Sequence, residues 1–368
     1  MSTRKDKFSK KDKKYMSLAL TLASARHGLT GENPSVGCVI VKNDEIISVG
    51  QTSYNGRPHA EYNAIKDSNE LLEDSTMYVT LEPCNHYGKT PPCTKEIIKN
   101  KISKIIYSVE DVDKKVKGKS FKIFKSKNII VKKGLLNKEV NKFYKPYFFN
   151  RKNKIPYVTG KIAVSKNNLI YSKGTKRITD IHSDKLTHFL RYKNDSLMIS
   201  YKTLNEDNPK LNCRLEGLFK FSPKRIILDS NLKMNTNSYI FKTANKNNTT
   251  IFYKEADGTK ISKFKKKGIQ LIKSSLLKNG NFDIKVIFKK LYSLGCRNLL
   301  VEGGNDLSKS IINKKLFNQF YLFKGSKNLS KSIAYKYFNF FKDLSQKYKS
   351  KNKIKTQLGK DLITLYKK

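Results

Sequence analysis

HAE at residues 59–61 and PCNHYGKTPPC at residues 83–93 place an imidazole, two thiols and a carboxylate in a short length of chain. One imidazole and two thiolates can hold Zn²⁺ and leave its fourth position open for water, as in catalytic zinc sites. We therefore predict that His59, Cys84 and Cys93 bind zinc. Glu61 lies two residues after the ligand histidine, so it can stay off the metal and transfer protons as the catalytic residue. The competing interpretation is a pair of buried thiols, or a disulfide, beside a solvated carboxylate.

The spacing of the two thiols narrows this prediction. H-x-E followed by P-C-x-x-C is typical of zinc deaminases that act on nucleobases. This chain keeps the first half of that pattern but has a longer loop between Cys84 and Cys93. HAE with PC-x-H-x-G-x-TPPC resembles the deaminase half of a family of bifunctional riboflavin-biosynthesis enzymes, the diaminohydroxyphosphoribosylaminopyrimidine deaminase / 5-amino-6-(5-phosphoribosylamino)uracil reductases. The resemblance implies an N-terminal cytidine-deaminase-like layered α/β domain.

The same resemblance implies the substrate, an aminopyrimidine that carries a ribose phosphate. Zinc would lower the pKa of bound water from 15.7 towards about 7, and Glu61 would move the protons. By position, Asn33 would contact the base through its amide, and His86 and Lys89 would meet the ribose phosphate. The alternative is that Asn33 is a turn residue before a proline, and that His86 and Lys89 are ordinary loop residues.

Composition limits the partners of this 368-residue chain. Its net charge of +46 is high enough for nucleic acid, but lysines are spread along the whole sequence and arginine, the better base reader, is sparse. We expect a small-molecule substrate and no specific nucleic-acid partner, with a nucleic-acid-acting zinc deaminase as the less favoured alternative.

No apolar run approaches the roughly 18 residues of a membrane span, and no signal peptide is evident. Five cysteines, scattered along the chain, favour a reducing cytoplasm, and a homo-oligomer is left open.

The order of the predicted elements indicates two α/β domains. We expect a basic tail over residues 1–14, a zinc deaminase domain over residues 15–149, and a second domain over residues 150–368, with a linker around residues 142–154. In the first domain the hydrophobic pattern predicts helices over residues 15–27, 59–72 and 94–100, and strands over residues 36–41, 45–49, 76–81 and 104–109.

The second domain carries weaker signals. It has no G-x-G-x-x-G motif, so a Rossmann site is not supported. We expect strands over residues 157–164, 196–200, 225–228, 298–301 and 361–366, a helix over residues 184–192, and partial disorder in 324–353. VEGG at residues 301–304 reads as a strand entering a glycine pair, where backbone can approach a phosphate, although a tight turn is the commoner interpretation. The order of KIAVS, TLNEDNPKL, ILDS and VEGG resembles the reductase half of the same family, which implies a dihydrofolate-reductase-like α/β domain that uses NADPH.

Positions of the reductase half carry over residue by residue. The residues implied to contact NADPH are Ala163, Arg177, Thr203, Asp207, Ser230, Gly304, Asn305, Asp306, Leu307, Ser308, Lys309 and Ser310. The residues implied to contact the substrate are Thr175, Arg191, Leu211, Arg214 and Glu302. Two arginines in the second set are reasonable because a guanidinium binds phosphate in a bidentate manner. The reaction implied is hydride delivery to C1 of the ring-opened sugar, which turns the ribosyl group into ribityl.

Four departures from the family pattern bear on the reductase half. Residues 165–168 read SKNN instead of Ser-Leu-Asp-Gly, Arg177 replaces a Trp, residues 200–203 read SYKT instead of Gly-x-Gly-Thr, and Asn318-Gln319 replaces an acidic pair. These changes favour the alternative of a deaminase whose reductase domain is degenerate and weakly active.

On the resemblance of both halves, we expect a bifunctional enzyme of riboflavin biosynthesis. It would deaminate 2,5-diamino-6-(5-phosphoribosylamino)pyrimidin-4(3H)-one and then form 5-amino-6-(5-phosphoribitylamino)uracil with NADPH.

Overall fold

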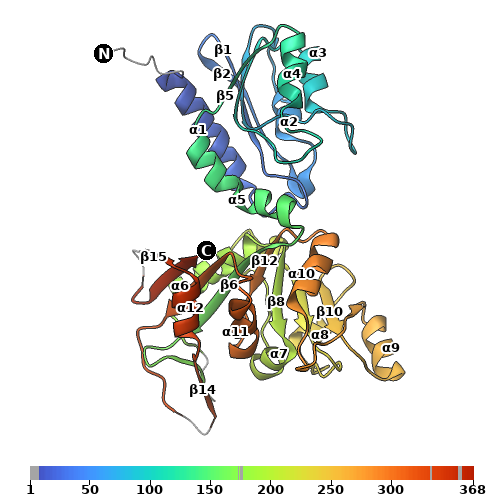
Figure 1. Cartoon of the computed structure of the whole chain (residues 1–368), viewed down its shortest axis with the longest axis vertical. Coiled ribbons are helices and arrows are strands. Elements are labelled where there is room, and N and C mark those ends of the chain that lie inside the picture. The colour runs from blue at the N-terminus through green and yellow to red at the C-terminus, as the bar shows by residue number, and fades with distance from the viewer. Residues whose placement is uncertain (1–7, 173, 175–176, 332–333, 355–358) are drawn as a thin grey trace. The chain divides into compact units, whose positions relative to one another are not determined.

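The chain forms two compact units that divide between Lys154 and Ile155. Figure 1 shows the computed structural model, which describes residues 8–172, 174, 177–331, 334–354 and 359–368. The boundary expected from the sequence, before Asn150, falls inside a helix. Within the described residues, no helix combines the length and the apolar character that a membrane crossing requires.

The first unit is built around one mixed sheet. Its elements are α1 (Lys10–Ala25), β1 (Gly37–Lys42), β2 (Glu45–Gln51), the 3-10 turn η1 (Tyr54–Gly56), α2 (Ala60–Lys66), β3 (Thr76–Leu81), α3 (Cys93–Lys99), β4 (Lys104–Val109), α4 (Lys119–Ser126), β5 (Ile130–Lys133) and α5 (Asn137–Asn153). The described strands lie in the order β2-β1-β3-β4-β5. β1 is antiparallel to both β2 and β3, whereas β3, β4 and β5 are parallel. The carboxyl ends of these three strands therefore meet at one edge.

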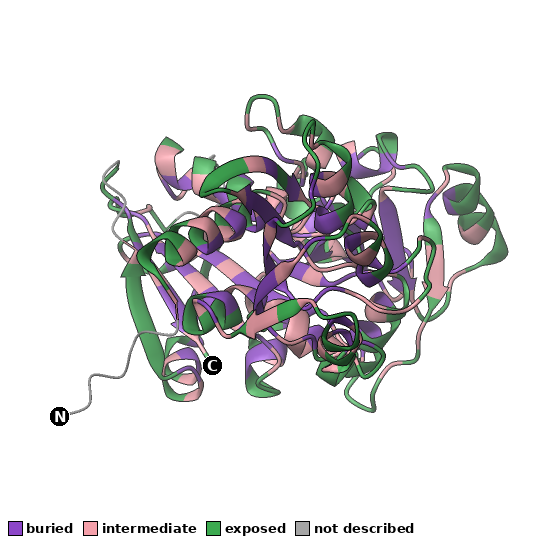
Figure 2. Cartoon of the chain, turned by 90° about the horizontal axis from the view of Figure 1, so that it is seen from above, coloured by how far each residue is buried: buried purple, intermediate pink, exposed green. Residues whose placement is uncertain are grey.

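Both faces of this sheet are covered, which explains its continuous apolar strands. On β1, Cys38 and Ile40 join one buried cluster with residues of α2 and α3, while Val39 and Val41 join another with residues of α1. Buried residues accordingly concentrate on the strands, and the outer helix faces are exposed (Figure 2). The predicted strands 76–81 and 104–109 coincide with β3 and β4.

The expected basic tail is too long, because α1 already begins at Lys10. A capping box starts the helix there. The Asp12 N–H donates to Ser9 Oγ at 3.0 Å, and the Ser9 N–H donates to Asp12 Oδ2 at 2.7 Å. The S-x-x-D pattern at residues 9–12 was the overlooked signal.

The expected linker at residues 142–154 is also wrong, because α5 runs through most of it. Its aliphatic and aromatic residues recur at helical spacing and pack on the sheet as Val140, Phe143, Tyr144, Tyr147 and Phe148. The side chain of Tyr144 lies with its hydroxyl 2.7 Å from Thr80 Oγ1. Packing of this stripe offsets the helix penalty of Pro146. The predicted helix 59–72 is shorter than expected and ends at Lys66.

The second unit has a large, mostly parallel sheet. Its elements are β6 (Tyr157–Val164), β7 (Leu169–Ser172), α6 (Ile181–Tyr192), β8 (Ser196–Ser200), α7 (Tyr201–Asp207), the 3-10 turn η2 (Phe219–Phe221), β9 (Lys224–Leu228), α8 (Tyr239–Lys242), β10 (Thr249–Tyr253), α9 (Gly258–Lys266), β11 (Gln270–Lys273), α10 (Ile284–Ser293), β12 (Asn298–Val301), α11 (Asn305–Asn313), β13 (Gln319–Lys324), β14 (Tyr335–Tyr337), α12 (Phe341–Lys347), β15 (Ser350–Ile354) and β16 (Leu362–Lys367). Its main sheet has the order β11-β10-β9-β8-β12-β6-β13-β16-β15, and β7 pairs with β14 in a separate ribbon.

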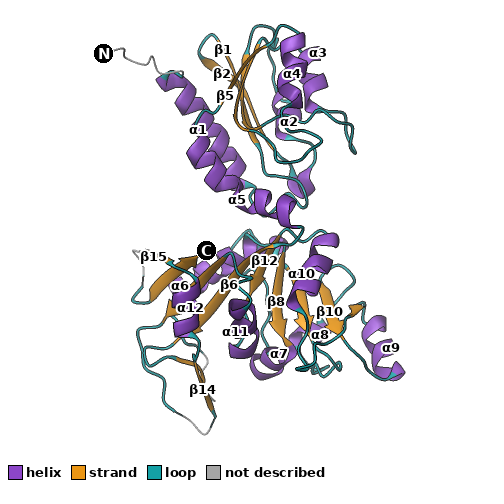
Figure 3. Ribbon diagram, viewed as in Figure 1, coloured by secondary structure: helices purple, strands orange, loops and turns teal. Residues whose placement is uncertain are grey.

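Helices cover both faces of this sheet (Figure 3). Residues of α10, α11 and α12 share one buried cluster, and residues of α6, α7, α8 and α9 share the other. From β8 the chain proceeds through β9, β10 and β11 to one edge of the sheet, and then returns to the other side of β8 as β12, where the strand order reverses. In open parallel sheets such a switch point is where ligands bind, beyond the carboxyl ends of the strands.

Most sequence-predicted strands of this unit are found where expected, including β6, β8 and β12 with identical bounds. The segment of residues 324–353, where partial disorder is expected, contains β14, α12 and β15, and its residues 332–333 lie outside the described residues. Three side chains of that segment are fully buried, those of Phe340, Leu344 and Tyr348. The lysine-rich composition of the segment made these buried apolar residues hard to recognise in the sequence.

Replacement of Gly160 on β6 by alanine should destabilise the second unit by about 1–3 kcal/mol, because the site is already filled. A Cβ there would lie 2.3 Å from Cδ2 of Phe320 and 2.7 Å from Cε1 of Phe317. Thermal and denaturant unfolding of the full chain would measure the loss.

The matched control is Gly258→Ala, where a Cβ would meet no atom within 4 Å. That variant should stay within about 1 kcal/mol of the wild type or become slightly more stable. Equal stability of the two variants would contradict the packing described for β6.

Candidate active sites in the two units

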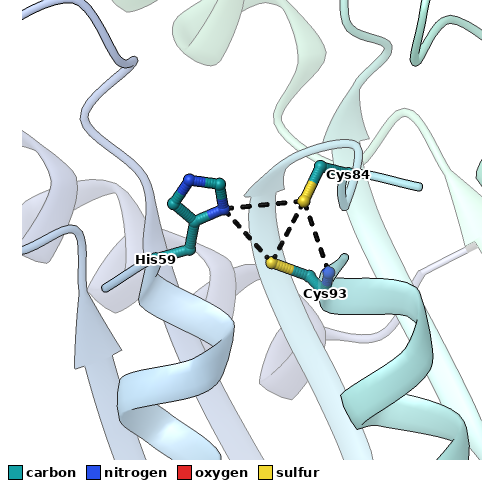
Figure 4. Close-up of side chains that lie close together, drawn as sticks. All are labelled: His59, Cys84 and Cys93. Carbon is teal, nitrogen blue, oxygen red and sulfur yellow. Dashed lines mark hydrogen bonds between the residues drawn. The ribbon is translucent and has the colours of Figure 1, made fainter. Parts of the chain in front are cut away.

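Three donor atoms of the first unit converge on one point. His59 caps the start of α2, Cys93 is the first residue of α3, and Cys84 lies in the loop after β3. Nδ1 of His59 lies 3.3 Å from Sγ of Cys93 and 3.6 Å from Sγ of Cys84, and the two sulfurs are 3.5 Å apart. Figure 4 shows the three side chains pointing toward one another.

These distances fit a zinc ion. Tetrahedral zinc with Zn–S of about 2.3 Å and Zn–N of about 2.0 Å sets its donor atoms about 3.5–3.8 Å apart. The triangle of His59, Cys84 and Cys93 is close to that size before any adjustment. The two sulfurs are not joined in a disulfide, so the disulfide interpretation is wrong.

The residues around Cys84 lower the pKa of its thiol, which favours metal binding. Hydrogen bonding with Cys93 lowers the pKa of Cys84 to about 4, with further help from His59, although burial opposes the shift. The backbone N–H of Cys93 donates to Cys84 Sγ at 3.3 Å. A thiolate, which is the form that binds metals, is therefore present at neutral pH.

Glu61 lies in the first turn of α2 and is almost completely buried. Burial raises the pKa of its carboxyl, although the charge of His59 opposes this. Glu61 does not belong to the cluster of donor atoms formed by the three ligands. A buried carboxyl beside the cluster, with a raised pKa, has the character of a proton carrier.

A second buried carboxylate, Glu82, fixes the segment that leads to Cys84. Oε2 of Glu82 accepts hydrogen bonds from the N–H groups of Asp111 (3.3 Å) and Gly118 (3.0 Å). Oε1 accepts from the hydroxyl and the N–H of Ser120, at 2.6 and 3.3 Å. Glu82 therefore ties the end of β3 to the loop before α4, and the sequence alone gave no sign of this.

The predicted base- and phosphate-contacting residues lie around the same segments. Asn33 donates from Nδ2 to the carbonyl of Gly56 at 2.9 Å, close to the chain that enters His59. His86 and Lys89 lie in the loop between the two thiols, and Nδ1 of His86 is buried without a hydrogen-bond partner among the described residues. Arg57, which the sequence analysis missed, donates from Nη1 to Thr90 Oγ1 across this loop.

The second unit contains a cavity of about 460 Å³ at the switch point of its sheet. It lies at the carboxyl ends of β8, β9 and β12. Its lining includes eight of the residues predicted to contact NADPH, namely Thr203, Asp207, Ser230, Gly304, Asn305, Asp306, Leu307 and Ser310. Gly304 precedes α11, and a Cβ there would lie 3.5 Å from Thr203 Oγ1, so the starts of α7 and α11 approach closely.

The other four predicted cofactor residues do not line this cavity. Ala163 is half-buried on β6, and Arg177 is exposed and forms an ion pair with Asp184 at 3.1 Å. Ser308 is buried and donates its hydroxyl to Gly303 O at 3.1 Å, and Lys309 is exposed. α11 turns these last two side chains away from the cavity because a helix presents only one face to a ligand.

Arg191 and Glu302, predicted to contact substrate, are bound to each other. Nε and Nη2 of Arg191 donate to the two carboxylate oxygens of Glu302, each at 2.7 Å. Burial alone would raise the pKa of Glu302, but the charge and hydrogen bonds of Arg191 outweigh it and lower the pKa. This bidentate pair already occupies one edge of the guanidinium. The expected phosphate contact of Arg191 is therefore left to its remaining edge, where Nη1 donates to Asn212 O at 3.1 Å.

More side chains gather around this pair. Burial lowers the pKa of Lys161 on β6, although the charge of Glu302 opposes the shift. His188 is buried, and its Nδ1 accepts a hydrogen bond from the N–H of Arg214 at 3.3 Å. Burial and the charges of Arg191 and Arg214 lower the pKa of His188 to about 4. Leu211 is buried with a φ of 51° just before this segment, and Thr175 lies outside the described residues.

Comparison with known proteins identifies the family of both units. The zinc-binding region of cytidine and deoxycytidylate deaminases matches residues 9–109, and the RibD C-terminal domain matches residues 156–331. The riboflavin biosynthesis protein RibD of Aquifex aeolicus (strain VF5) is 32% identical over 359 residues, which cover 97% of this chain and 98% of that protein. This chain belongs to the RibD family.

Solved RibD structures have the same fold. The deaminase/reductase of Thermotoga maritima is 26% identical, with a TM-score of 0.78 over 97% of this chain and 98% of that one. RibD of Acinetobacter baumannii, form 2, is 24% identical, with a TM-score of 0.83 over 97% of this chain and 99% of that one. The predicted fold class is confirmed, with a cytidine-deaminase-like unit followed by a dihydrofolate-reductase-like unit.

As a RibD protein, the chain is a bifunctional deaminase and reductase of riboflavin biosynthesis. Zinc and NADPH are the cofactors of its two halves. The predictions of a bifunctional enzyme and of these two cofactors are confirmed.

Some departures from the RibD pattern have structural roles in this chain. Oδ1 of Asn318 accepts a hydrogen bond from the N–H of Val158 at 2.7 Å, and Gln319 Nε2 donates to Thr159 Oγ1 at 3.0 Å. Nδ2 of Asn167 donates to the carbonyl of Leu329 at 2.8 Å. These amide side chains form hydrogen bonds with buried or half-buried polar groups of the second unit. The substitutions are therefore compatible with the fold of this unit.

We expect Glu302→Gln to destabilise the second unit by about 3–5 kcal/mol at pH 7, since it leaves the buried Arg191 charge without its counter-ion. The pKa of Glu302 is lower in the folded chain, so its contribution is present above the unfolded value of about 4.3 and is lost as the pH falls through the folded value. The stability difference between wild type and variant should therefore shrink below about pH 4. Denaturant titrations over this pH range measure it.

Glu255→Gln serves as the control, because Glu255 pairs with Lys254 at an exposed site. That change should cost less than about 1 kcal/mol. A Glu302→Gln penalty as small as the control, or one that grows on acidification, would contradict the assigned pair.

Proposed function

We propose that the first unit deaminates 2,5-diamino-6-(5-phosphoribosylamino)pyrimidin-4(3H)-one, and that the second reduces the product with NADPH to 5-amino-6-(5-phosphoribitylamino)uracil. The convergence of His59, Cys84 and Cys93 beside a spare buried carboxylate carries the proposal. The Thermotoga maritima relative, whose name states these two activities, supports the substrate assignment.

In the proposed deamination, Glu61 acts as the general base and the general acid. His59, Cys84 and Cys93 would hold zinc, whose Lewis acidity would lower the pKa of a water molecule. Glu61 accepts a proton as this water attacks the ring carbon that bears the amine, and passes it to the adjacent ring nitrogen. It then assists transfer of a proton to the amine, which leaves as ammonia, so that a C–N bond is exchanged for a C=O bond.

The remaining predicted residues position the substrate. The Asn33 amide is assigned to the pyrimidine edge, with Oδ1 left available because Nδ2 holds Gly56 O. His86 and Lys89 are assigned to the ribose phosphate, and the buried, unpartnered Nδ1 of His86 supports a polar ligand there. Arg57 holds the same loop at Thr90 and adds positive charge beside it.

For the reduction, NADPH supplies a hydride when bound in the cavity of the second unit. Gly304 and the first turn of α11 are assigned to its phosphates, and Thr203, Asp207 and Ser230 to its flanking groups. The substrate is assigned to the region of Arg191, Glu302 and Arg214. Of these, Arg214 is exposed and is the better placed to take the phosphate.

We also propose that the enzyme works in the cytoplasm on small molecules, without a specific nucleic-acid partner. Five free cysteines support a reducing compartment. Non-specific binding of nucleic acid is expected from a net charge of +46 and should vanish as salt is raised.

Glu61→Gln should keep its metal and lose deamination by roughly 10²–10⁴-fold, because the ligands remain and only the proton carrier is removed. Metal analysis and ammonia release, both on the purified full chain, measure the two properties. Glu70→Gln, an exposed change in the same unit, is the control and should retain activity.

Loss of metal from Glu61→Gln, or deamination at the control rate, would overturn the role given to Glu61. The reductase half is tested separately, by oxidation of NADPH when deaminated substrate is supplied. Absence of oxidation would favour the alternative of a degenerate reductase domain.

A further inference from the structure

Lys202 is a positively charged residue at a position where the RibD pattern has glycine. The chain reads Ser200-Tyr201-Lys202-Thr203 in place of Gly-x-Gly-Thr. Lys202 lies in the first turn of α7 and lines the cavity assigned to NADPH. A glycine in such a place lets a ligand approach the backbone, whereas a lysine fills that space with a flexible cation.

The side chain of Lys202 reaches the start of the neighbouring helix. Its Nζ lies 3.8 Å from Oδ2 of Asp306, in the first turn of α11. Both side chains are largely exposed, at 63% and 90%, so the amine is not locked in this contact. The separation exceeds a hydrogen bond, and exposed pairs of this kind add little stability. Lys202 can therefore exchange Asp306 for another anion at low cost.

The charges around the cavity favour an exchange in which Lys202 leaves Asp306 and binds a phosphate. Three carboxylates line it, those of Glu206, Asp207 and Asp306, against the two amines of Lys202 and Lys336. Lys336 is already held by Glu206 at 2.6 Å. A diphosphate at the glycine-led start of α11 would face the carboxylate of Asp306. Lys202 already lies beside Asp306 and can offset that repulsion.

We propose that Lys202 is a cofactor-binding residue that contacts the diphosphate of NADPH. The inference rests on the proposed reductase function and adds a residue that the RibD pattern does not supply. In place of close backbone approach at a glycine, this chain uses a side-chain cation that leaves Asp306 when the dinucleotide enters. The contact is assigned to the diphosphate, not the 2′-phosphate, because the Nζ of Lys202 lies 3.8 Å from Asp306 in the first turn of α11. The next residue, Thr203, approaches Gly304, which precedes that helix.

Binding of NADPH and NADH to the purified full chain tests this, by titration calorimetry without substrate. Lys202→Gly restores the family residue and removes the cation. Both affinities should fall by about tenfold, the amount expected for loss of one charge-assisted contact. The ratio of the two affinities should not change, because both dinucleotides carry the diphosphate. Lys202→Arg should restore most of the binding.

Lys289→Ala is the matched control, since Lys289 is an exposed lysine of α10 outside the cavity lining. Its affinities should equal those of the wild type, and thermal unfolding should show that all variants are folded. Unchanged or tighter binding by Lys202→Gly would overturn the inference, and so would a loss confined to NADPH, which would assign Lys202 to the 2′-phosphate. Failure of the wild type to bind NADPH would instead overturn the reductase function, and the inference with it.

Discussion

The deaminase half depends on one constraint, that three donor atoms from separate segments stay within about 3.6 Å of one another, as zinc coordination requires. His59 and Cys93 are fixed by the starts of two helices, but Cys84 comes from a loop. Glu82 compensates by accepting hydrogen bonds from Asp111, Gly118 and Ser120. The loop before α4 therefore helps to fix the segment that carries a metal ligand.

The reductase half is organised differently, because no short motif contains its site. Its cavity combines residues at the ends of β8, β9 and β12. The neighbouring pair of Arg191 and Glu302 joins positions 111 residues apart, and its two short hydrogen bonds fix both side chains. This half consequently tolerates changes of motif where the replaced residues still satisfy buried groups, as Asn318 and Gln319 do.

Sequence reasoning succeeded where the information is local. Strands such as β3 and β4 are short apolar runs between polar residues, and the zinc ligands belong to two compact motifs. It failed where tertiary packing decides. α5 was mistaken for a linker because Pro146 and lysines hid its apolar stripe. The burial of His188 and the clamp of Glu82 could not be foreseen, because their partners lie 26 to 38 residues away in sequence.

The strand order of the second unit has a consequence for its folding during translation. β6 is its first strand, yet its main-sheet partners are β12 and β13, and β12 begins only at Asn298. The first unit contains all the partners of its own strands and can fold while translation continues. The backbone N–H and C=O groups along both edges of β6 stay unpaired until β12 and β13 have been synthesised. Such late, long-range pairing is slow, and the nascent chain is then most exposed to aggregation and most in need of chaperones.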